Sequence, residues 1–502
     1  MSSLLKGPGA AALLTPAEMS AADRHAIDAG TPGELLMRRA ARAVAKAAAE
    51  LVPDGRVAVL AGSGNNGGDA YGAASVLRAQ GRSVTVFALS PRHALSGDAR
   101  LLADEWAGAM QALEDFGPAG FALVVDGLFG AGLSREVGGR AAQAIERTNG
   151  DAVPVLAIDL PSGVAGEDGQ VRGTAMRATR TATFFRRKPG HLLQPGRSLC
   201  GAIEVADIGI DTAILDILSP RTFANDPALF ARRLLTPQDT HHKYDRGHAV
   251  VFSGGASQTG AARLCAMAAL RGGAGLVTLF SPPAALLVNA SHLTAIMLRR
   301  CADAQDLGAH LEDRRLSTFV LGPGFGDAEN ARAFASAILE AGRALVLDAD
   351  GITAFSGDPD ALFASIGRAG GGNVALTPHD GEFARLFPDL ARLPSKLDRA
   401  RQAARRSGAV VVLKGSDTVI ASPDGRAAIN GNGPANLATA GSGDVLSGLV
   451  AAQFANGVPA FEAACAAVWL HADAAAAFGP GLIAEDLPGL VPGALARLAA
   501  ER

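Results

Sequence analysis

Two glycine-rich turns, one in each half of the chain, lie between a run of apolar residues and a helical pattern. Residues 56–60 (RVAVL) lead into AGSGNNGGDAYGAA, and the next apolar run follows at residues 83–88. In the second half the pattern restarts at residues 247–255 (GHAVVFSGG) and returns around ATAGSGDVLSG at residues 438–448. A strand, a turn and a helix in this order are typical of a βαβ unit. The chain is therefore predicted to form two separate nucleotide-handling domains of the α/β class.

Further apolar runs in both halves end in charged residues. Residues 122–126 and 155–159 end in Asp126 and Asp159, and residues 410–414 end in Lys414. In parallel sheets the carboxyl ends of the strands face the ligand crevice, so we expect functional side chains there. A proline-punctuated segment separates the halves and predicts domains of residues 1–226 and 227–502.

The composition excludes several other classes of protein. With 48% hydrophobic and 5% aromatic residues and 61 glycines, the 502-residue chain is typical of soluble α/β proteins. A net charge of -3 leaves no basic surplus for binding nucleic acid. The four cysteines show neither zinc nor disulfide spacing, which favours a reducing, cytoplasmic setting. Residues 272–298 carry no formal charge, but their prolines and polar residues predict a buried strand, a turn and a helix rather than a membrane span.

Four motifs of the second half follow predicted strands or lie close after them. They are GPGFG (322–326), TPHDGE (377–382), KGSDT (414–418) and NLATAGSGDVLSG (436–448). Together with HKYDRGHAVVFSGG (242–255), they resemble the ADP-dependent NAD(P)H-hydrate dehydratase branch of the ribokinase-like fold, over roughly residues 240–495. The resemblance implies a three-layer α/β/α domain. It also implies that the hydroxyl of a hydrated dihydronicotinamide ring is phosphorylated and that the phosphate is then eliminated.

Asp444 lies among glycines that would otherwise only hold an anion. Gly441 and Gly443 let backbone amides at a helix N-terminus approach a phosphate, and Asp444 can accept the proton of the attacking hydroxyl. The resemblance implies ADP and Mg²⁺ as cofactors, and a set of residues that contact the nucleotide or the hydrated cofactor. This set is Ala261, Gly324, His379, Lys414, Gly415, Ser416, Asp417, Thr418, Gly443 and Asp444.

Each motif has a structural alternative when it is taken alone. GSGD is similar to many glycine-rich turns before helices, and TPHDGE also fits a helix N-terminus whose acidic residues complement the helix dipole. His379 alone fits a structural, hydrogen-bonding histidine. The four motifs in combination favour the ligand site.

Three motifs of the first half combine amide and carboxylate oxygens with backbone N–H groups: NNGGD (65–69), DGLFGAG (126–132) and DLPSG (159–163). Such an oxygen-rich crevice suits a monovalent cation. Over roughly residues 15–215 the motifs resemble the NAD(P)H-hydrate epimerase domain, which has a Rossmann-like three-layer α/β/α fold. The resemblance implies that Asn66, Asp126 and Ser162 ligate K⁺. The residues it implies for the hydrate are Asn65, Asn66, Gly67, Gly68, Asp69, Gly130, Ala131, Gly132, Leu133, Ser134, Arg135, Glu136 and Asp159. Interconverting the two epimers requires a proton carrier, and either Asp126 or Asp159 fits that role.

The two halves together predict a fused repair enzyme for NADHX and NADPHX, the hydrated forms of NADH and NADPH. The epimerase would interconvert the R and S hydrates, and the dehydratase would convert the S hydrate to NAD(P)H while ADP gives AMP and phosphate. Loops that hold phosphates look alike for ADP and ATP, so the donor stays open, with ADP the family expectation. A vitamin or sugar kinase and a non-catalytic nucleotide-sensing protein are the alternatives. We expect a cytoplasmic homo-oligomer that binds neither nucleic acid nor membrane.

Overall fold

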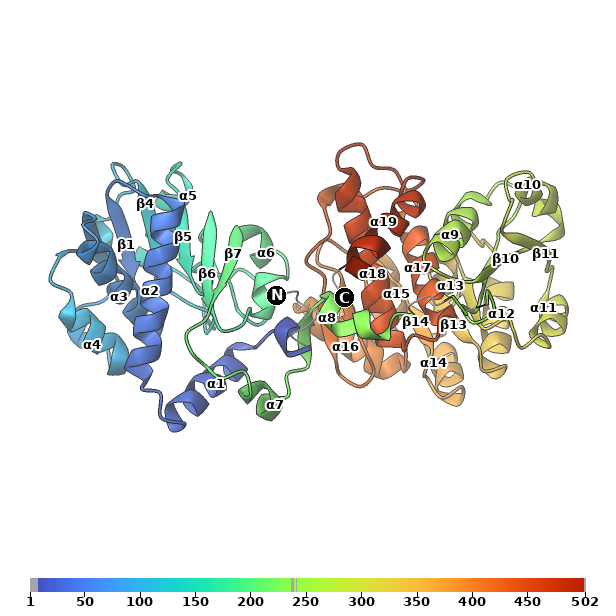
Figure 1. Cartoon of the computed structure of the whole chain (residues 1–502), viewed down its shortest axis with the longest axis horizontal. Helices are drawn as coiled ribbons and strands as arrows, with labels where there is room; N and C mark the ends of the chain where they lie inside the picture. Colours follow the sequence, from blue (N-terminus) through green and yellow to red (C-terminus); the bar gives the residue numbers. More distant parts are fainter. Residues whose placement is uncertain (1–7, 236–238, 241, 501–502) are drawn as a thin grey trace. The chain divides into compact units, whose positions relative to one another are not determined.

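The computed structural model describes residues 8–235, 239–240 and 242–500. The chain divides into two compact units (Figure 1). The first is Ala12–Thr222, and the second joins the described residues from Phe223 onward to the short 3-10 helix Pro8–Ala11. Each unit has its own sheet, its own helices and its own apolar core.

The first unit is built on a seven-stranded parallel sheet. In spatial order the strands are β3(Ala109–Ala112), β2(Val84–Ala88), β1(Val57–Ala61), β4(Leu123–Gly127), β5(Val155–Ile158), β6(Arg180–Phe184) and β7(Ala202–Ala206). Strands β2, β1, β4 and β5 are buried throughout, as expected of parallel strands covered on both faces. The chain reverses direction across the sheet between β1 and β4. Open α/β sheets bind ligands at such a switch point.

Helices cover both faces of this sheet. They are α1(Pro16–Asp28), α2(Gly33–Leu51), α3(Asn65–Ala79), α4(Gly97–Glu105), α5(Gly139–Asn149), α6(Gly196–Leu199) and α7(Ile214–Leu218). Val57 and Val59 of β1 belong to the core that contains α2, α3 and α4, whereas Ala58 and Leu60 belong to the core that contains α5. This alternation follows from the period-two geometry of a strand. The unit therefore has three layers, α/β/α.

The second unit contains a ten-stranded mixed sheet. In spatial order the strands are β11(Met297–Arg300), β10(Leu276–Ser281), β9(His248–Phe252), β12(Thr318–Leu321), β13(Ala344–Leu347), β14(Val374–Leu376), β15(Val410–Leu413), β16(Val419–Ala421), β17(Ala427–Ile429) and β8(Thr222–Ala224). Strands β11 to β15 pair in parallel, and β15, β16 and β17 pair antiparallel. The switch point lies between β9 and β12.

Helices cover this sheet as well. They are α8(Pro227–Phe230), α9(Gly260–Arg271), α10(Leu286–Ala290), α11(Ala304–Leu311), α12(Ala328–Glu340), α13(Ala349–Thr353), α14(Pro359–Arg368), α15(Asp380–Leu386), α16(Lys396–Ser407), α17(Ser442–Ala455), α18(Ala460–Phe478) and α19(Leu487–Ala500). Gly448 allows α17 to lie directly on α9, because a Cβ at this position would come within 2.1 Å of the Cys265 carbonyl oxygen. The predicted fold class, two three-layer α/β units, is confirmed.

Residues 272–298 contain β10, the 3-10 helix Pro283–Ala285 and α10, which is the predicted strand, turn and helix. Among the helices within the described ranges, none has the length and apolar character that crossing a membrane requires.

Candidate active sites

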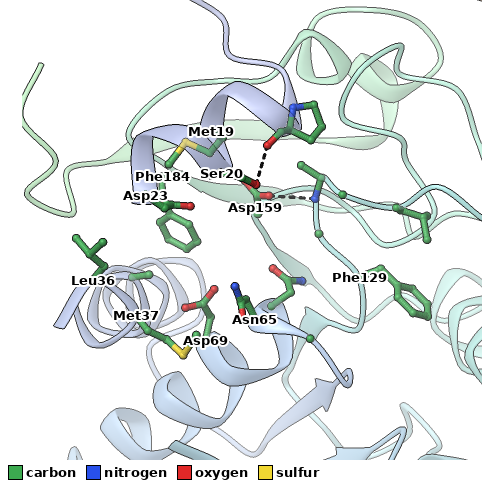
Figure 2. Close-up of a pocket in the computed structure, with 18 of the residues that line it drawn as sticks. Met19, Ser20, Asp23, Leu36, Met37, Asn65, Asp69, Phe129, Asp159 and Phe184 are labelled. Carbon is green, nitrogen blue, oxygen red and sulfur yellow. Dashed lines mark hydrogen bonds between the residues drawn. The ribbon is translucent and has the colours of Figure 1, made fainter. Parts of the chain in front are cut away.

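A cavity of about 530 Å³ lies in the first unit, next to the loops that follow β1, β4 and β5. Residues of α1, α2 and the start of α3 also contribute to its wall (Figure 2). Its volume lies within the usual range for small-molecule sites. The predicted hydrate-binding residues that line it are Asn65, Asn66, Asp69, Gly130, Ala131, Gly132, Leu133, Ser134, Arg135 and Asp159.

Three of the predicted hydrate-binding residues are not among the lining residues: Gly67, Gly68 and Glu136. NNGGD is the beginning of α3 rather than a loop. A Cβ on Gly67 would lie 2.0 Å from the Gly62 carbonyl oxygen, and one on Gly68 would lie 2.7 Å from the Cα of Ala99. These two glycines therefore serve the close packing of α3 against its neighbours.

Asp126 and Ser162 form a fully buried pair that does not line the cavity. The Ser162 hydroxyl donates to Oδ1 of Asp126 at 2.6 Å, and the Ser162 backbone N–H donates to Oδ2 at 2.8 Å. Burial raises the pKa of Asp126 to about 6, although the hydrogen bonds from Ser162 act in the opposite direction. The carboxylate is thus held in place but lacks a compensating positive charge among the described residues.

Asp159 lies in the cavity wall directly after β5 and is paired with a lysine. Lys188 Nζ donates to Oδ1 of Asp159 at 2.5 Å, the Thr183 hydroxyl donates to the same oxygen at 2.9 Å, and the Ala131 N–H donates to Oδ2 at 3.1 Å. Burial pushes the pKa of Asp159 upward, but the charge and hydrogen bond of Lys188 outweigh it and hold the pKa at about 2. Asp159 is therefore ionised near neutral pH.

The backbone of Asp159 is held in an unusual conformation. Its φ of 65° lies in the left-handed region, which is costly for a residue with a Cβ. The ring of His191 fixes this turn. Its Nδ1 accepts from the Lys188 N–H at 2.9 Å, so Nε2 carries the proton and donates to the Asp159 carbonyl oxygen at 2.7 Å. Burial lowers the pKa of His191 to about 4, which keeps the ring neutral.

Two further aspartates line the same cavity, Asp23 from α1 and Asp69 from α3. Figure 2 shows both side chains turned toward the cavity. Burial raises the pKa of Asp23 to about 6, with Lys188 acting against it. Burial also raises the pKa of Asp69, well above its usual value, and the charges of Asp159 and Asp23 add to the effect. The cavity thus contains carboxyl groups whose pKa values are shifted in opposite directions.

In the second unit, a group of charged side chains lies at the carboxyl ends of β13 and β15. Lys414 Nζ donates to Oδ1 of Asp348 at 2.7 Å and lies 3.9 Å from Oε2 of Glu382. The Ser447 hydroxyl of α17 donates to Oδ2 of Asp348 at 2.7 Å. Burial works against the charge of Lys414, but Asp348 and Glu382 outweigh it and raise the pKa of the ammonium group.

Asp444 is in the first turn of α17, next to this charged group. Gly441 precedes the helix with a φ of 86°, a conformation that favours glycine. Gly443 is also close to the charged group, since a Cβ on it would lie 3.3 Å from Lys414 Nζ. Burial, and then the charge of Asp348, raise the pKa of Asp444 to about 6, while Lys414 lowers it. A pKa near the working pH suits a general base.

The remaining predicted residues of the second unit come from neighbouring turns. Gly324, with a φ of 60°, lies close to α9, because a Cβ on it would be 3.4 Å from the Cβ of Ala261. His379 is the N-cap of α15: its Nδ1 accepts from the Gly381 N–H at 2.9 Å. Its backbone N–H donates to Oε2 of Glu382 at 2.9 Å, which completes a capping box. The structural alternative for His379 is thus present, with the side chain still more than half exposed.

A lysine of α16 hydrogen-bonds to the KGSDT turn between β15 and β16. Lys396 Nζ donates to Oδ1 of Asp417 at 2.7 Å and to the Lys414 carbonyl oxygen at 3.2 Å. Within the turn, the Thr418 hydroxyl donates to the Gly415 carbonyl oxygen at 2.8 Å. Both Lys396 and Asp417 are buried. The turn that contains Lys414 to Thr418 therefore has a defined shape without a ligand.

The sequence interpretation did not identify five residues that shape these sites. Asp348 directly follows the apolar strand β13, so the strand-end argument that selected Asp126 and Asp159 could have selected it too. Lys188 and His191 belong to a short turn after β6, and Asp23 and Lys396 belong to helices. Nothing in their local sequence distinguishes them from other charged residues, since only the fold brings them to the sites.

Family models match a large part of each unit of the chain. The family model described as NAD(P)H-hydrate dehydratase matches residues 249–484, and that of the YjeF-related protein N-terminus matches residues 33–190. Proteins named bifunctional NAD(P)H-hydrate repair enzyme Nnr are similar over nearly the whole chain. The one from Gloeobacter violaceus is 38% identical, covering 94% of each chain, and the one from Escherichia coli is 32% identical, covering 90% of this chain and 87% of its own.

Among solved structures, the ADP/ATP-dependent NAD(P)H-hydrate dehydratase of Bacillus subtilis, co-crystallised with ATP and Mg²⁺, matches 53% of this chain and 95% of its own. It does so with 25% identity and a TM-score of 0.44. From the identity and coverage of the full-length relatives, the chain belongs to the family of bifunctional NAD(P)H-hydrate repair enzymes.

Proposed function

We propose that the protein repairs NADHX and NADPHX in two successive reactions. The epimerase domain, residues 1–226, interconverts the R and S hydrates. The dehydratase domain, residues 227–502, converts the S hydrate to NADH or NADPH at the expense of ADP, which gives AMP and phosphate. Membership of the repair-enzyme family supports both activities, and the presence of a separate candidate site in each unit supports their division between the units.

The main observation in support of the dehydratase reaction is the position of Asp444, at the start of α17 and beside Lys414. The backbone N–H groups of the first turn of α17 would bind the phosphate of the donor. Asp444 would take the proton from the ring hydroxyl as it attacks, and Lys414 would neutralise charge on the phosphate. Elimination of the phosphate from C6, with loss of a proton from C5, then restores the C=C bond. The KGSDT turn would hold the nucleotide, and Ala261, Gly324 and His379 would contact the hydrated ring.

The acidic groups around Lys414 also fit Mg²⁺. Because Mg²⁺ in nucleotide sites is held by phosphate oxygens and one or two carboxylates, Asp348 and Glu382 are the residues that would hold it here. The ion supplies neutralisation of the phosphate charge when it is bound. Phosphate oxygens of the bound nucleotide would supply further ligands to the ion.

In the epimerase domain, access to the cavity favours Asp159 over Asp126 as the proton carrier. Asp159 lines the cavity and is ionised, whereas Asp126 is fully buried and does not line it. Asp126 and Ser162 instead fit the predicted K⁺ site, because their oxygens are adjacent and the buried carboxylate needs a counter-charge. Asn66 fits as well, since its buried amide nitrogen has no partner and an amide flip would present an oxygen in its place. Bound K⁺ would neutralise Asp126.

The function is tested with purified S hydrate, ADP and Mg²⁺. We expect the near-ultraviolet absorbance of the dihydronicotinamide ring to return, with one AMP and one phosphate formed per ring restored. A vitamin or sugar kinase would instead leave a stable phosphate ester, and a nucleotide sensor would leave both reactants unchanged. Either of these results would contradict the proposal. Parallel reactions with ADP and with ATP identify the donor.

The role of Asp126 is tested with Asp126→Asn. We expect slower interconversion of the R and S hydrates, together with a weaker dependence of that rate on K⁺, because the ion loses its charged ligand. Dehydration of the pure S hydrate serves as the internal control and should keep its rate. Equal loss of both activities would contradict independent sites.

A further inference from the structure

The epimerase cavity contains two aspartates in opposite electrostatic settings. Both oxygens of Asp159 accept hydrogen bonds, and Lys188 neutralises the charge. Asp69 is only 9% exposed and, among the residues that the structure describes, has neither a hydrogen-bond donor nor a cation paired with it. Figure 2 shows the two side chains entering the cavity from opposite sides, Asp69 from α3 and Asp159 from the turn after β5.

The different surroundings of Asp69 and Asp159 shift their pKa values in opposite directions. Burial raises the pKa of Asp69 well above the usual value, and the neighbouring carboxylates of Asp159 and Asp23 raise it further. The charge of Lys188 lowers the pKa of Asp69, but this lysine is already hydrogen-bonded to Asp159. Asp159 is ionised, with a pKa of about 2. Two carboxyl groups whose environments separate their pKa values are the usual arrangement of an acid and a base.

We propose, on the basis of the epimerase activity proposed above, that Asp69 and Asp159 are the acid and the base of the epimerase, acting on opposite faces of ring carbon C6. Inversion then requires that the C6–O bond breaks and that a new one forms from the other face. The ring nitrogen is bonded to C6, so its lone pair can drive this cleavage. Asp69 and Asp159 would handle the two protons that the exchange of oxygen requires.

The steps balance with water as the only co-reactant. The nitrogen lone pair forms a C6=N bond while the C6–O bond breaks, and Asp69 gives its proton to the departing oxygen, which leaves as water. A second water adds to C6 from the opposite face, the π electrons return to nitrogen, and Asp159 takes the proton of the added water. Asp69 is now ionised and Asp159 protonated, which is the state required for the reverse inversion. Proton exchange with solvent restores the first state.

A different route would invert C6 without exchanging its oxygen. If the ring opened by cleavage of the C6–N bond, the carbon would become an aldehyde, and reclosure on the other face before the aldehyde hydrates would retain the original oxygen. The two routes therefore differ in the origin of the hydroxyl oxygen, which mass spectrometry can read.

The first test uses the full chain, pure R hydrate and water labelled with oxygen-18, without ADP. We expect each inverted molecule to carry one labelled oxygen, while molecules that have not turned over stay unlabelled. Inversion that retains the original oxygen would overturn the proposed cleavage. If the native chain did not interconvert the epimers at all, the epimerase activity itself would fail, and this outcome is distinct from failure of the proposed mechanism.

The second test uses Asp69→Asn, which keeps the shape of the side chain but removes the proton it donates. We expect interconversion to fall by about 10²-fold or more, the scale of a general acid. Asp104→Asn is the matched control, because Asp104 is exposed and pairs with Arg100 on α4, away from the cavity. Near-normal interconversion by Asp69→Asn would overturn the role of Asp69.

A loss of activity in Asp69→Asn must be separated from misfolding. Two measurements do this: the dehydration rate of pure S hydrate, and the affinity of the variant for the R hydrate, measured as protection of the first unit from hydrogen exchange. We expect both to stay close to the native values. A variant that loses binding together with inversion would assign Asp69 to substrate binding and overturn its role as the acid.

Discussion

The two units use the same small group of side chains in different electrostatic settings. In each, an aspartate that follows a strand is paired with a lysine: Asp159 with Lys188 in the first unit, and Asp348 with Lys414 in the second. In each, a second aspartate near the start of a helix, Asp69 or Asp444, has a raised pKa and no hydrogen-bonded lysine within the described part of the chain.

The difference lies in the burial of the second aspartate. Asp69 is 9% exposed inside a cavity, whereas Asp444 is only partly buried and sits beside Lys414, which lowers its pKa. Burial shifts the pKa of Asp69 well above its usual value, which favours its protonated form, whereas Asp444, with a pKa of about 6, is mostly ionised near neutral pH. The same residue type is thus proposed as an acid in one unit and as a base in the other, because burial and neighbouring charges differ between the two sites.

The largest expected effect tests the base in the second unit. Asp444→Asn should fold and bind nucleotide but lose about 10²–10⁴-fold in the rate of dehydration, since the amide cannot accept the hydroxyl proton. Stopped-flow recovery of dihydronicotinamide absorbance measures this rate. Near-normal turnover by the variant would show that Asp444 is not the base.

The next effect tests whether Lys188 compensates the buried carboxylate of Asp159. Lys188→Met should lower the free energy of unfolding of the first unit by about 3 kcal/mol, because an unpaired charge stays partly buried. In the double variant Lys188→Met/Asp159→Asn most of this loss should be recovered. Denaturant titration of the full chain, followed by hydrogen exchange in β5 and β6, gives both values. Equal stability of the single and double variants would contradict a compensating role.

The pH dependence should separate the two activities. Because burial raises the pKa of Asp444 to about 6, acidification below that value protonates the base, and kcat/KM for dehydration should fall about tenfold per pH unit. Asp159, with a pKa of about 2, stays ionised over the same range. At saturating K⁺, which would keep Asp126 ionised, interconversion should therefore fall less. Rates of both reactions measured between about pH 5 and pH 8 test this difference. Parallel decline would contradict it.

The smallest expected effect concerns the hydrogen bonds by which Lys396 holds the KGSDT turn, the turn proposed to bind the nucleotide. Lys396→Met removes two hydrogen bonds to this turn, so KM for ADP should rise by up to about tenfold while kcat changes little. Lys396→Arg can still donate to Asp417 and should recover part of the affinity. A fall in kcat with an unchanged KM would show that Lys396 does not act by positioning this turn.

Most of the inner strands could be predicted from the sequence. Apolar runs at residues 83–88, 122–126, 155–159 and 410–414 became β2, β4, β5 and β15, because strands buried on both faces must be largely apolar. The edge strands were not identified. β3 is exposed at every position and β7 is only partly buried, so neither shows the apolar run on which the prediction depends.

The candidate sites were predictable where a motif continues directly from a strand or starts a helix. Asp159, Lys414 and Asp444 are of this kind, since the carboxyl end of a parallel strand and the N-terminus of a helix have fixed directions. Gly67 and Gly68 show the limit of the approach. Their motif pointed to a ligand, but the structure uses these glycines for close backbone contacts of α3.

The sequence by itself determined that the chain has two α/β units, which motifs lie at the ends of their strands, and which chemistry those motifs suit. These properties depend on local pattern, because strand burial and helix starts are encoded in neighbouring residues. Only the tertiary structure decided that Lys188 neutralises Asp159, that Asp69 lies unpaired in a cavity, and that Lys414 pairs with Asp348. The protonation state of a carboxyl group depends on its burial and on charges from distant parts of the chain, and these are set only when the chain has folded.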